Sequence, residues 1–199
     1  MRKNSIKILL LFAFSLLLAS CPGKKTPSQP GGIFTMDETE EAGNQVREAN
    51  DLLKLIKQRF KDNEDRIQEL QAAMKGKNSD TVKKISDQLV TEINAGTEVG
   101  EAAINKLRIA QEKNINEDFK EYLRLKIEAL EKYVQAFEER RQAAILLRDG
   151  YDPKNAAKRD QVIAAFKQRE DKFKEIVEDA RKISEEANRL ARDSLNRKS

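Results

Sequence analysis

The residues of this chain that could carry out chemistry are one cysteine and two pairs of neighbouring carboxylates. Cys21 is the only cysteine among the 199 residues, and it directly follows an apolar run. The carboxylate pairs, Glu138-Glu139 and Glu185-Glu186, lie among basic residues, which is typical of a solvated helix face. The chain has no histidine and therefore lacks the Glu-x-x-His pairs that hold two metal ions in helical bundles. We expect no metal, no cofactor and no catalytic residue, and interpret the protein as a non-enzyme.

The first twenty residues have the pattern of a secretory signal peptide. Arg2, Lys3 and Lys7 form a basic start, and an apolar stretch of about eleven residues follows at 8–18. That stretch is too short to span a bilayer, which needs roughly twenty apolar residues. The pattern predicts a signal peptide over 1–20.

The end of this segment resembles the lipobox of bacterial lipoproteins. The residues that carry the resemblance are Leu18, Ala19 and Ser20 as the recognition sequence, with Cys21 as the lipidation site. The resemblance implies that Cys21 receives a diacylglyceryl thioether, that the preceding peptide is removed and that the new amino terminus is acylated. Two or three acyl chains anchor stably where one binds marginally. We expect a mature chain held by lipid on a membrane outside the cytoplasm.

The residue after the lipobox cysteine bears on which membrane carries the protein. In proteobacterial lipoproteins an aspartate there favours the inner membrane, and this chain has Pro22. We therefore favour the outer membrane. A periplasmic location, a cell-surface location and a Gram-positive host stay open as alternatives.

Residues 21–34 are predicted to form a flexible tether. Three of the four prolines and several glycines fall in this stretch, and few of its residues could contribute to a core. The breakers are Pro22, Gly23, Pro27, Pro30, Gly31 and Gly32.

The charge of the chain argues against nucleic-acid binding. Removal of the leader takes away three of the 38 basic residues and none of the 34 acidic ones, so the mature side chains are close to neutral. Acids and bases also alternate along every segment, whereas nucleic-acid binding needs a clustered basic face. We expect no nucleic-acid partner.

Helix-breaking residues divide the predicted helical domain, 35–199, into four helices. The breaks are Gly76, the polar stretch 114–116 and the cluster 150–153, which predict helices at about 36–75, 79–113, 117–149 and 153–196. A Thr35-x-x-Glu38 capping box and Gly76 should delimit the first helix. The expected caps of the other helices are Asn78 or Ser79, Asn116, and Asp152 followed by Pro153.

Apolar residues recur at alternating steps of three and four in the first, third and fourth of these helices. This period predicts long, gently supercoiled helices. Because the connections are short, neighbouring helices must be antiparallel, and we predict an all-α fold, an up-down-up-down four-helix bundle. A pair of splayed or dimerising coiled-coil hairpins is the alternative.

Two residues interrupt the apolar seams, and two glycines interrupt the second helix. Asn63 and Arg141 could fix helix register or extend their polar ends to solvent at the edge of the seam, or they could line a polar pocket inside the bundle. Gly96 and Gly100, four residues apart, could allow close helix approach, or could form a hinge or a thin-walled stretch that borders a ligand cavity.

Two classes of function are compatible with this sequence. The first is a lipid-anchored structural or interaction protein, a helical rod that contacts a protein or cell-wall partner or a second copy of itself. The alternative is a binding module with a small-molecule or lipid cavity in the bundle core. Five apolar residues of the third helix lie off its main seam and could serve a partner or pack on an adjacent helix, which we favour. They are Tyr122, Leu125, Tyr133, Ile145 and Leu146.

Overall fold

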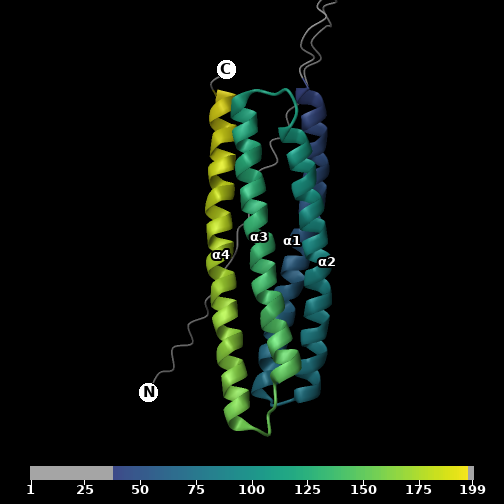
Figure 1. Cartoon of the computed structure of the whole chain (residues 1–199), viewed down its shortest axis with the longest axis vertical. Helices are drawn as coiled ribbons and strands as arrows, with labels where there is room; N and C mark the ends of the chain where they lie inside the picture. The colour runs from purple at the N-terminus through teal and green to yellow at the C-terminus, as the bar shows by residue number, and fades with distance from the viewer. Residues whose placement is uncertain (1–37, 197–199) are drawn as a thin grey trace, which may run out of the picture. The chain divides into compact units, whose positions relative to one another are not determined.

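Four long α-helices make up the part of the chain that the computed structural model describes, residues 38–196 (Figure 1). They are α1 (Thr39–Lys75), α2 (Ser79–Gln111), α3 (Glu117–Gly150) and α4 (Ala156–Asn196). The shortest has 33 residues and the longest 41, which at about 1.5 Å per residue makes them roughly 50 to 60 Å long. These elements confirm the predicted all-α helical bundle.

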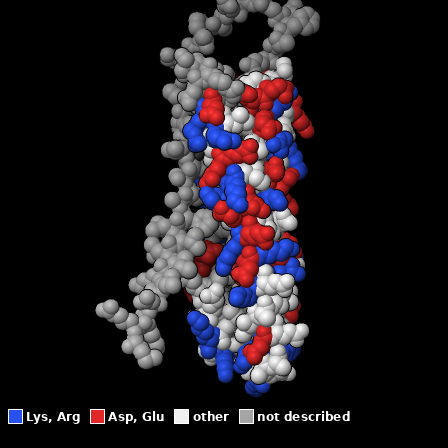
Figure 2. Space-filling model, turned by 90° about the vertical axis from the view of Figure 1, so that its left-hand side faces the viewer, with Lys and Arg blue, Asp and Glu red and all other residues white. Residues whose placement is uncertain are grey.

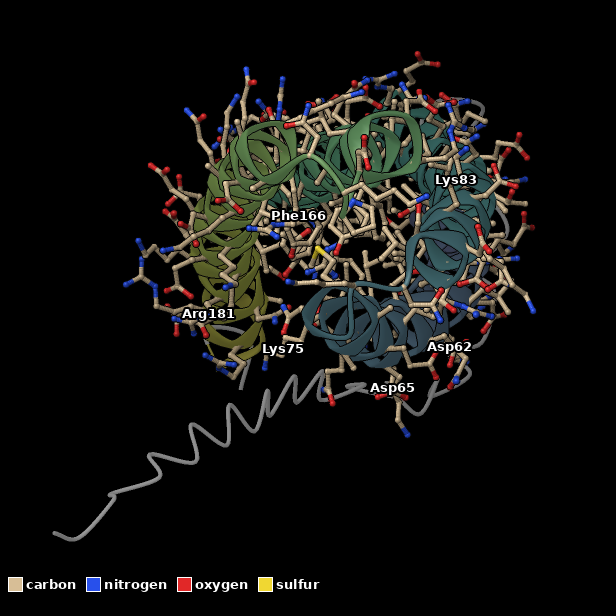
Figure 3. The ribbon with its side chains drawn as sticks, turned by 90° about the horizontal axis from the view of Figure 1, so that it is seen from below. Asp62, Asp65, Lys75, Lys83, Phe166 and Arg181 are labelled. Carbon is tan, nitrogen blue, oxygen red and sulfur yellow. The ribbon has the colours of Figure 1, made fainter. Side chains whose placement is uncertain are left out.

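Each helix packs on the one that follows it. Connections of a few residues, at 76–78, 112–116 and 151–155, make successive helices antiparallel. Seen along the helices, α1 to α4 occupy the four corners of the bundle in chain order (Figure 3). Neighbouring backbones approach closely between α1 and α2, α2 and α3, and α3 and α4, but no Cα of α1 lies within 8 Å of one in α4. The side between α1 and α4 is therefore wider than the other three, and only side chains bridge it. We call it the wide side of the bundle.

The core is built from the apolar seams. Ile56 and Leu70 of α1, Leu89 of α2 and Phe137 of α3 are buried together in one cluster. Phe166 of α4 belongs to the same cluster and lies on the inner side of its helix (Figure 3). Of the five off-seam residues of α3, Leu125 is buried, Tyr122 and Tyr133 pack against a buried cluster, and Ile145 and Leu146 are half-buried.

Asparagine side chains cap α2 and α3. The Asn78 side-chain oxygen accepts a hydrogen bond from the Thr81 backbone N–H at 3.0 Å, and Asn116 accepts one from Phe119 at 2.8 Å. Each bond satisfies a donor that the first turn leaves unpaired. These two predicted caps are confirmed. The predicted box at the start of α1 includes Thr35, which lies outside the described residues.

The end of α1 differs from the prediction. Gly76 keeps right-handed helical geometry, with φ −74°, and Lys77 instead takes the left-handed conformation, with φ 54°. The Asn78 N–H then bonds back to the Ala73 carbonyl at 3.0 Å, which closes the helix. The residue with a positive φ is therefore Lys77, one residue after the predicted Gly76.

The start of α4 also differs. The expected cap, Asp152, accepts a hydrogen bond from the Lys154 N–H at 2.9 Å and so folds a local turn. Asn155 caps the helix, because its side chain accepts the Lys158 N–H at 3.1 Å and the helix begins at Ala156. Pro153 lies in the turn before the helix rather than at its first position.

Candidate functional site

A buried arginine on α3 joins three helices. Arg140 is 1% exposed, and its guanidinium donates two hydrogen bonds to the carboxylate of Glu170 on α4, at 3.1 and 3.2 Å. The remaining branch donates to Glu64 of α1 at 2.6 Å. Glu170 is itself buried, whereas half of the Glu64 side chain is exposed. This cluster links α1 to α4 across the wide side of the bundle.

Aromatic rings surround this ion cluster. The Arg140 guanidinium carbon lies 3.5 Å from the centroid of the Phe173 ring, a cation–π contact worth about 2 kcal/mol when desolvated. Phe60 of α1 lies between three further rings, at centroid distances of 4.5 Å from Phe137 and 6.0 Å from both Tyr133 and Phe173. The rings of α1 and α4 therefore meet where their backbones do not.

A second buried acid strengthens the α3–α4 contact. Glu139 accepts hydrogen bonds or ion pairs from Arg169 and Lys172 of α4, each at 2.5 Å. Burial alone raises the pKa of Glu139, but these two cations outweigh it and hold the pKa below its ordinary value. The expectation that Glu138 and Glu139 share a solvated face is wrong for Glu139, which is buried, while Glu138 is exposed.

Asn63 is completely buried in α1. Neither the oxygen nor the nitrogen of its side chain has a hydrogen-bond partner among the described residues. A buried amide without partners costs free energy relative to an apolar residue of similar size. Asn63 therefore lies within the apolar seam of α1, and its amide forms no hydrogen bond with the residues around it.

Arg141 lies next to the buried arginine but has a different environment. It is half-buried and pairs with Glu138 of its own helix at 2.7 and 2.8 Å. The main apolar seam of α3 indicated Arg141 alone, because that seam is only one of the two faces that α3 buries against α2 and α4. Arg140 is on the face toward α4. A two-sided apolar pattern, with Ala129, Ala136 and Ala143 off the main seam, was the signal for that second face.

The two glycines of α2 lie next to side chains of α1 and α3. A Cβ on Gly100 would stand 2.9 Å from a methyl of Val134, closer than side chains tolerate. A Cβ on Gly96 would meet Phe137 and Arg59 at ordinary contact distances of 3.7 to 3.9 Å. Close approach is therefore a strict requirement at Gly100 and a loose one at Gly96.

The expected lipidation site and its recognition sequence, Cys21 with Leu18, Ala19 and Ser20, lie outside the described residues. Within 38–196, no group of three or more His, Cys, Asp or Glu side chains could hold a metal ion. None of the described helices is long and apolar enough to cross a membrane.

The fold and the buried ion cluster define a class of protein, the antiparallel four-helix bundle with charged residues locked between its helices. No protein-family model, no curated protein and no solved structure matches the chain.

Proposed function

We propose that this protein is a lipid-anchored, non-catalytic scaffold outside the cytoplasm, which offers the surface of its helical bundle to a protein or cell-wall partner. The lipobox-like Leu18-Ala19-Ser20-Cys21 supports the anchor, and the proline- and glycine-rich stretch after it supports a tether. The observation that supports the scaffold role is that the buried acids and the buried arginine form ion pairs between helices. Arg140, Glu139 and Glu170 all pair between helices, so their charges stiffen the bundle.

The surface of the bundle suits contacts with a mixed-charge partner. Acidic and basic side chains interleave over the face in Figure 2. Ion pairs also join the helices around α2, where Arg66 pairs with Glu92 and Arg108 pairs with Glu131, each at 2.6 Å. Interleaved charges create little field of one sign, which disfavours nucleic acid and favours a protein surface or cell-wall material.

Two large apolar side chains interrupt this charged surface. Leu55 of α1 is 53% exposed and Ile109 of α2 is 42% exposed. Apolar side chains ringed by charge are typical anchors of a protein interface. We propose that the partner, or a second copy of the chain in a homodimer, contacts the α1–α2 side of the bundle.

The anchor is tested by metabolic labelling with an alkyne-tagged fatty acid in a bacterial host. The wild-type chain is expected to carry the label and to fractionate with membranes. Cys21→Ala is expected to lose both properties, because the thiol is the acceptor. Equal labelling of the two proteins would contradict a lipid anchor at Cys21.

The contact surface is tested by photo-cross-linking in cells. A photoreactive residue at position 55 or 109 is expected to capture a discrete partner, or to give a band of twice the mass if the partner is a second copy. The matched control places the same residue at Lys174, an exposed position of α4. Equal capture at position 174 would exclude the α1–α2 side as the contact surface.

A further inference from the structure

Leu55 of α1 lies beside small apolar residues of α2 on the α1–α2 side of the bundle. A Cβ on Gly100 would lie 3.9 Å from the Cδ1 methyl of Ile56, so Leu55 is level with the next turn of α2. There α2 presents Val99, which is half-buried, and Ala102, which is exposed. Leu55 is itself 53% exposed. The α1–α2 side therefore has an apolar centre, whose leucine and alanine no other described helix covers.

Exposed acids flank Leu55 along α1. Asp51 lies one turn before Leu55. Asp62 and Glu69 lie two and four turns after it, so all three acids share its side of the helix. Asp62 points away from the core on the outer side of α1 (Figure 3). Glu69 forms no ion pair with a described residue, and Asp51 pairs only with Lys54 of its own helix. This ridge of α1 is therefore acidic.

Lysines flank Ala102 along α2 in the same way. Lys106 and Lys113 lie one and three turns after Ala102. Lys84 lies five turns before it, is exposed and forms no ion pair with a described residue. Within the chain, Lys106 pairs with Glu48 of α1 at 2.6 Å. The ridge of α2 on this side is therefore basic.

Two further charges lie at the outer edges of this side. Lys54 of α1 and Glu98 of α2 are both exposed, and Glu98 forms no ion pair with a described residue. Each has the opposite sign to the ridge beside it, and the two lie within about one turn of the same level. The charges that α1 presents on this side are thus complementary to those of α2 along its length.

A second copy of this chain fits that pattern. In a dimer whose twofold axis is parallel to the helices, α1 of each copy faces α2 of the other at the same level. The acidic ridge then meets the basic ridge, and the two apolar centres meet each other. A twofold axis perpendicular to the helices would instead place α1 against α1, and like charges across an interface cost free energy. The charges therefore favour the parallel arrangement.

We propose that two copies of the chain associate through their α1–α2 sides as a parallel dimer. This inference rests on the contact surface proposed above, and it names the partner as a second copy. Asp51 lies opposite the partner's Lys106, and Glu69 lies opposite the partner's Lys84. Both copies of α1 begin at the same end of the dimer, which suits two chains anchored in one membrane.

The first test is analytical ultracentrifugation of the full chain carrying Cys21→Ser. The parent chain is expected to be a dimer, which Leu55→Asp should weaken at least about tenfold. Glu69→Lys should also weaken it, and Glu69→Lys with Lys84→Glu should restore it, because the double variant exchanges the two charges. Glu175→Lys, at an exposed position of α4, is the matched control and should have no effect. All four substituted helix positions are exposed, so each variant should keep the helix content of the parent by circular dichroism.

Disulfide cross-linking tests the orientation of the two copies. Tagged chains with Leu55→Cys are mixed with untagged chains with Ala102→Cys, each also carrying Cys21→Ser. The parallel dimer is expected to give a disulfide between tagged and untagged chains. A dominant disulfide between two chains that both carry Ala102→Cys would indicate an antiparallel dimer and would overturn the proposal.

Two other results would overturn it: a monomeric parent chain, or a dimer that neither Leu55→Asp nor Glu69→Lys weakens. These results are distinguishable from a failure of the proposed function. If the chain is monomeric but photo-cross-linking at position 55 or 109 still captures another protein, the contact surface stands and only its assignment to a second copy is wrong.

Discussion

The guanidinium of Arg140 on α3 stacks on the ring of Phe173 on α4, 3.5 Å from its centroid. The same guanidinium reaches Glu64 of α1, whose backbone stays away from α4. Arg140 and the ring contact between Phe60 and Phe173 therefore join α1 to α4 on the wide side, where the helix backbones stay apart. The contribution of Arg140 can be separated from that of its partners by mutation.

Arg140→Ala is expected to destabilise the fold by about 3 to 5 kcal/mol, because it leaves the buried Glu170 carboxylate without a cation. The double variant Arg140→Met with Glu170→Leu should recover most of that loss, since it removes both charges and keeps the volume. Urea unfolding followed by circular dichroism measures both. A double variant as unstable as the single one would show that packing on Phe173, rather than charge, holds this site.

The two glycines of α2 form a matched pair for a second prediction. Gly96→Ala should stabilise the protein by up to about 1 kcal/mol, because alanine favours the helix and its Cβ meets only ordinary contacts. Gly100→Ala should instead destabilise it by about 1 to 3 kcal/mol, because its Cβ would crowd Val134. Thermal unfolding of the two variants side by side checks the opposite signs. If both were stabilising, α2 and α3 would be free to move apart at Gly100.

Asn63→Leu is expected to raise the free energy of unfolding by about 1 to 3 kcal/mol, because it replaces a buried amide without partners by an apolar side chain. Asn63→Asp is the contrasting variant and should be strongly destabilising, since it buries a charge. Chemical denaturation gives both values. A loss of stability in Asn63→Leu would mean that the amide has a partner, such as a bound water, that the leucine cannot replace.

Because the pKa of Lys126 differs between the folded and the unfolded chain, the stability of the protein should depend on pH. Burial, with a contribution from Lys57, lowers its folded pKa to about 8 from an ordinary value of 10.5. Below pH 8 the amine is charged in both states, so the full cost of burying it is present. Between pH 8 and 10.5 the folded protein loses this proton while the unfolded chain keeps it, so the cost is progressively relieved, by about 3 kcal/mol in all.

Lys126→Met should therefore be more stable than the wild type at pH 7, by an amount that shrinks as the pH rises to 10. Urea unfolding of both proteins at pH 7, 9 and 10 measures this difference. Lys174→Met controls for the loss of a lysine charge at an exposed position. An advantage that stays constant with pH would mean that Lys126 is solvated.

Much of the fold can be predicted from local sequence. The caps Asn78 and Asn116 act through side chains within three residues of their targets, so their roles can be read directly from the chain. The alternating three- and four-residue spacing of apolar residues likewise predicts helices that need a partner. By contrast, the position of the left-handed residue, Lys77 rather than Gly76, depends on how α1 and α2 meet.

The sequence by itself determined four antiparallel helices, because breakers, caps and apolar spacing are local properties and short connections force neighbours to pack. Tertiary structure alone decided which charged residues are buried. Adjacent residues such as Arg140 and Arg141 differ by about 100° around the helix, and only the positions of α1 and α4 relative to α3 select one of them. The same arrangement leaves Lys126 without an acid, because burial and pairing depend on residues far apart in the chain.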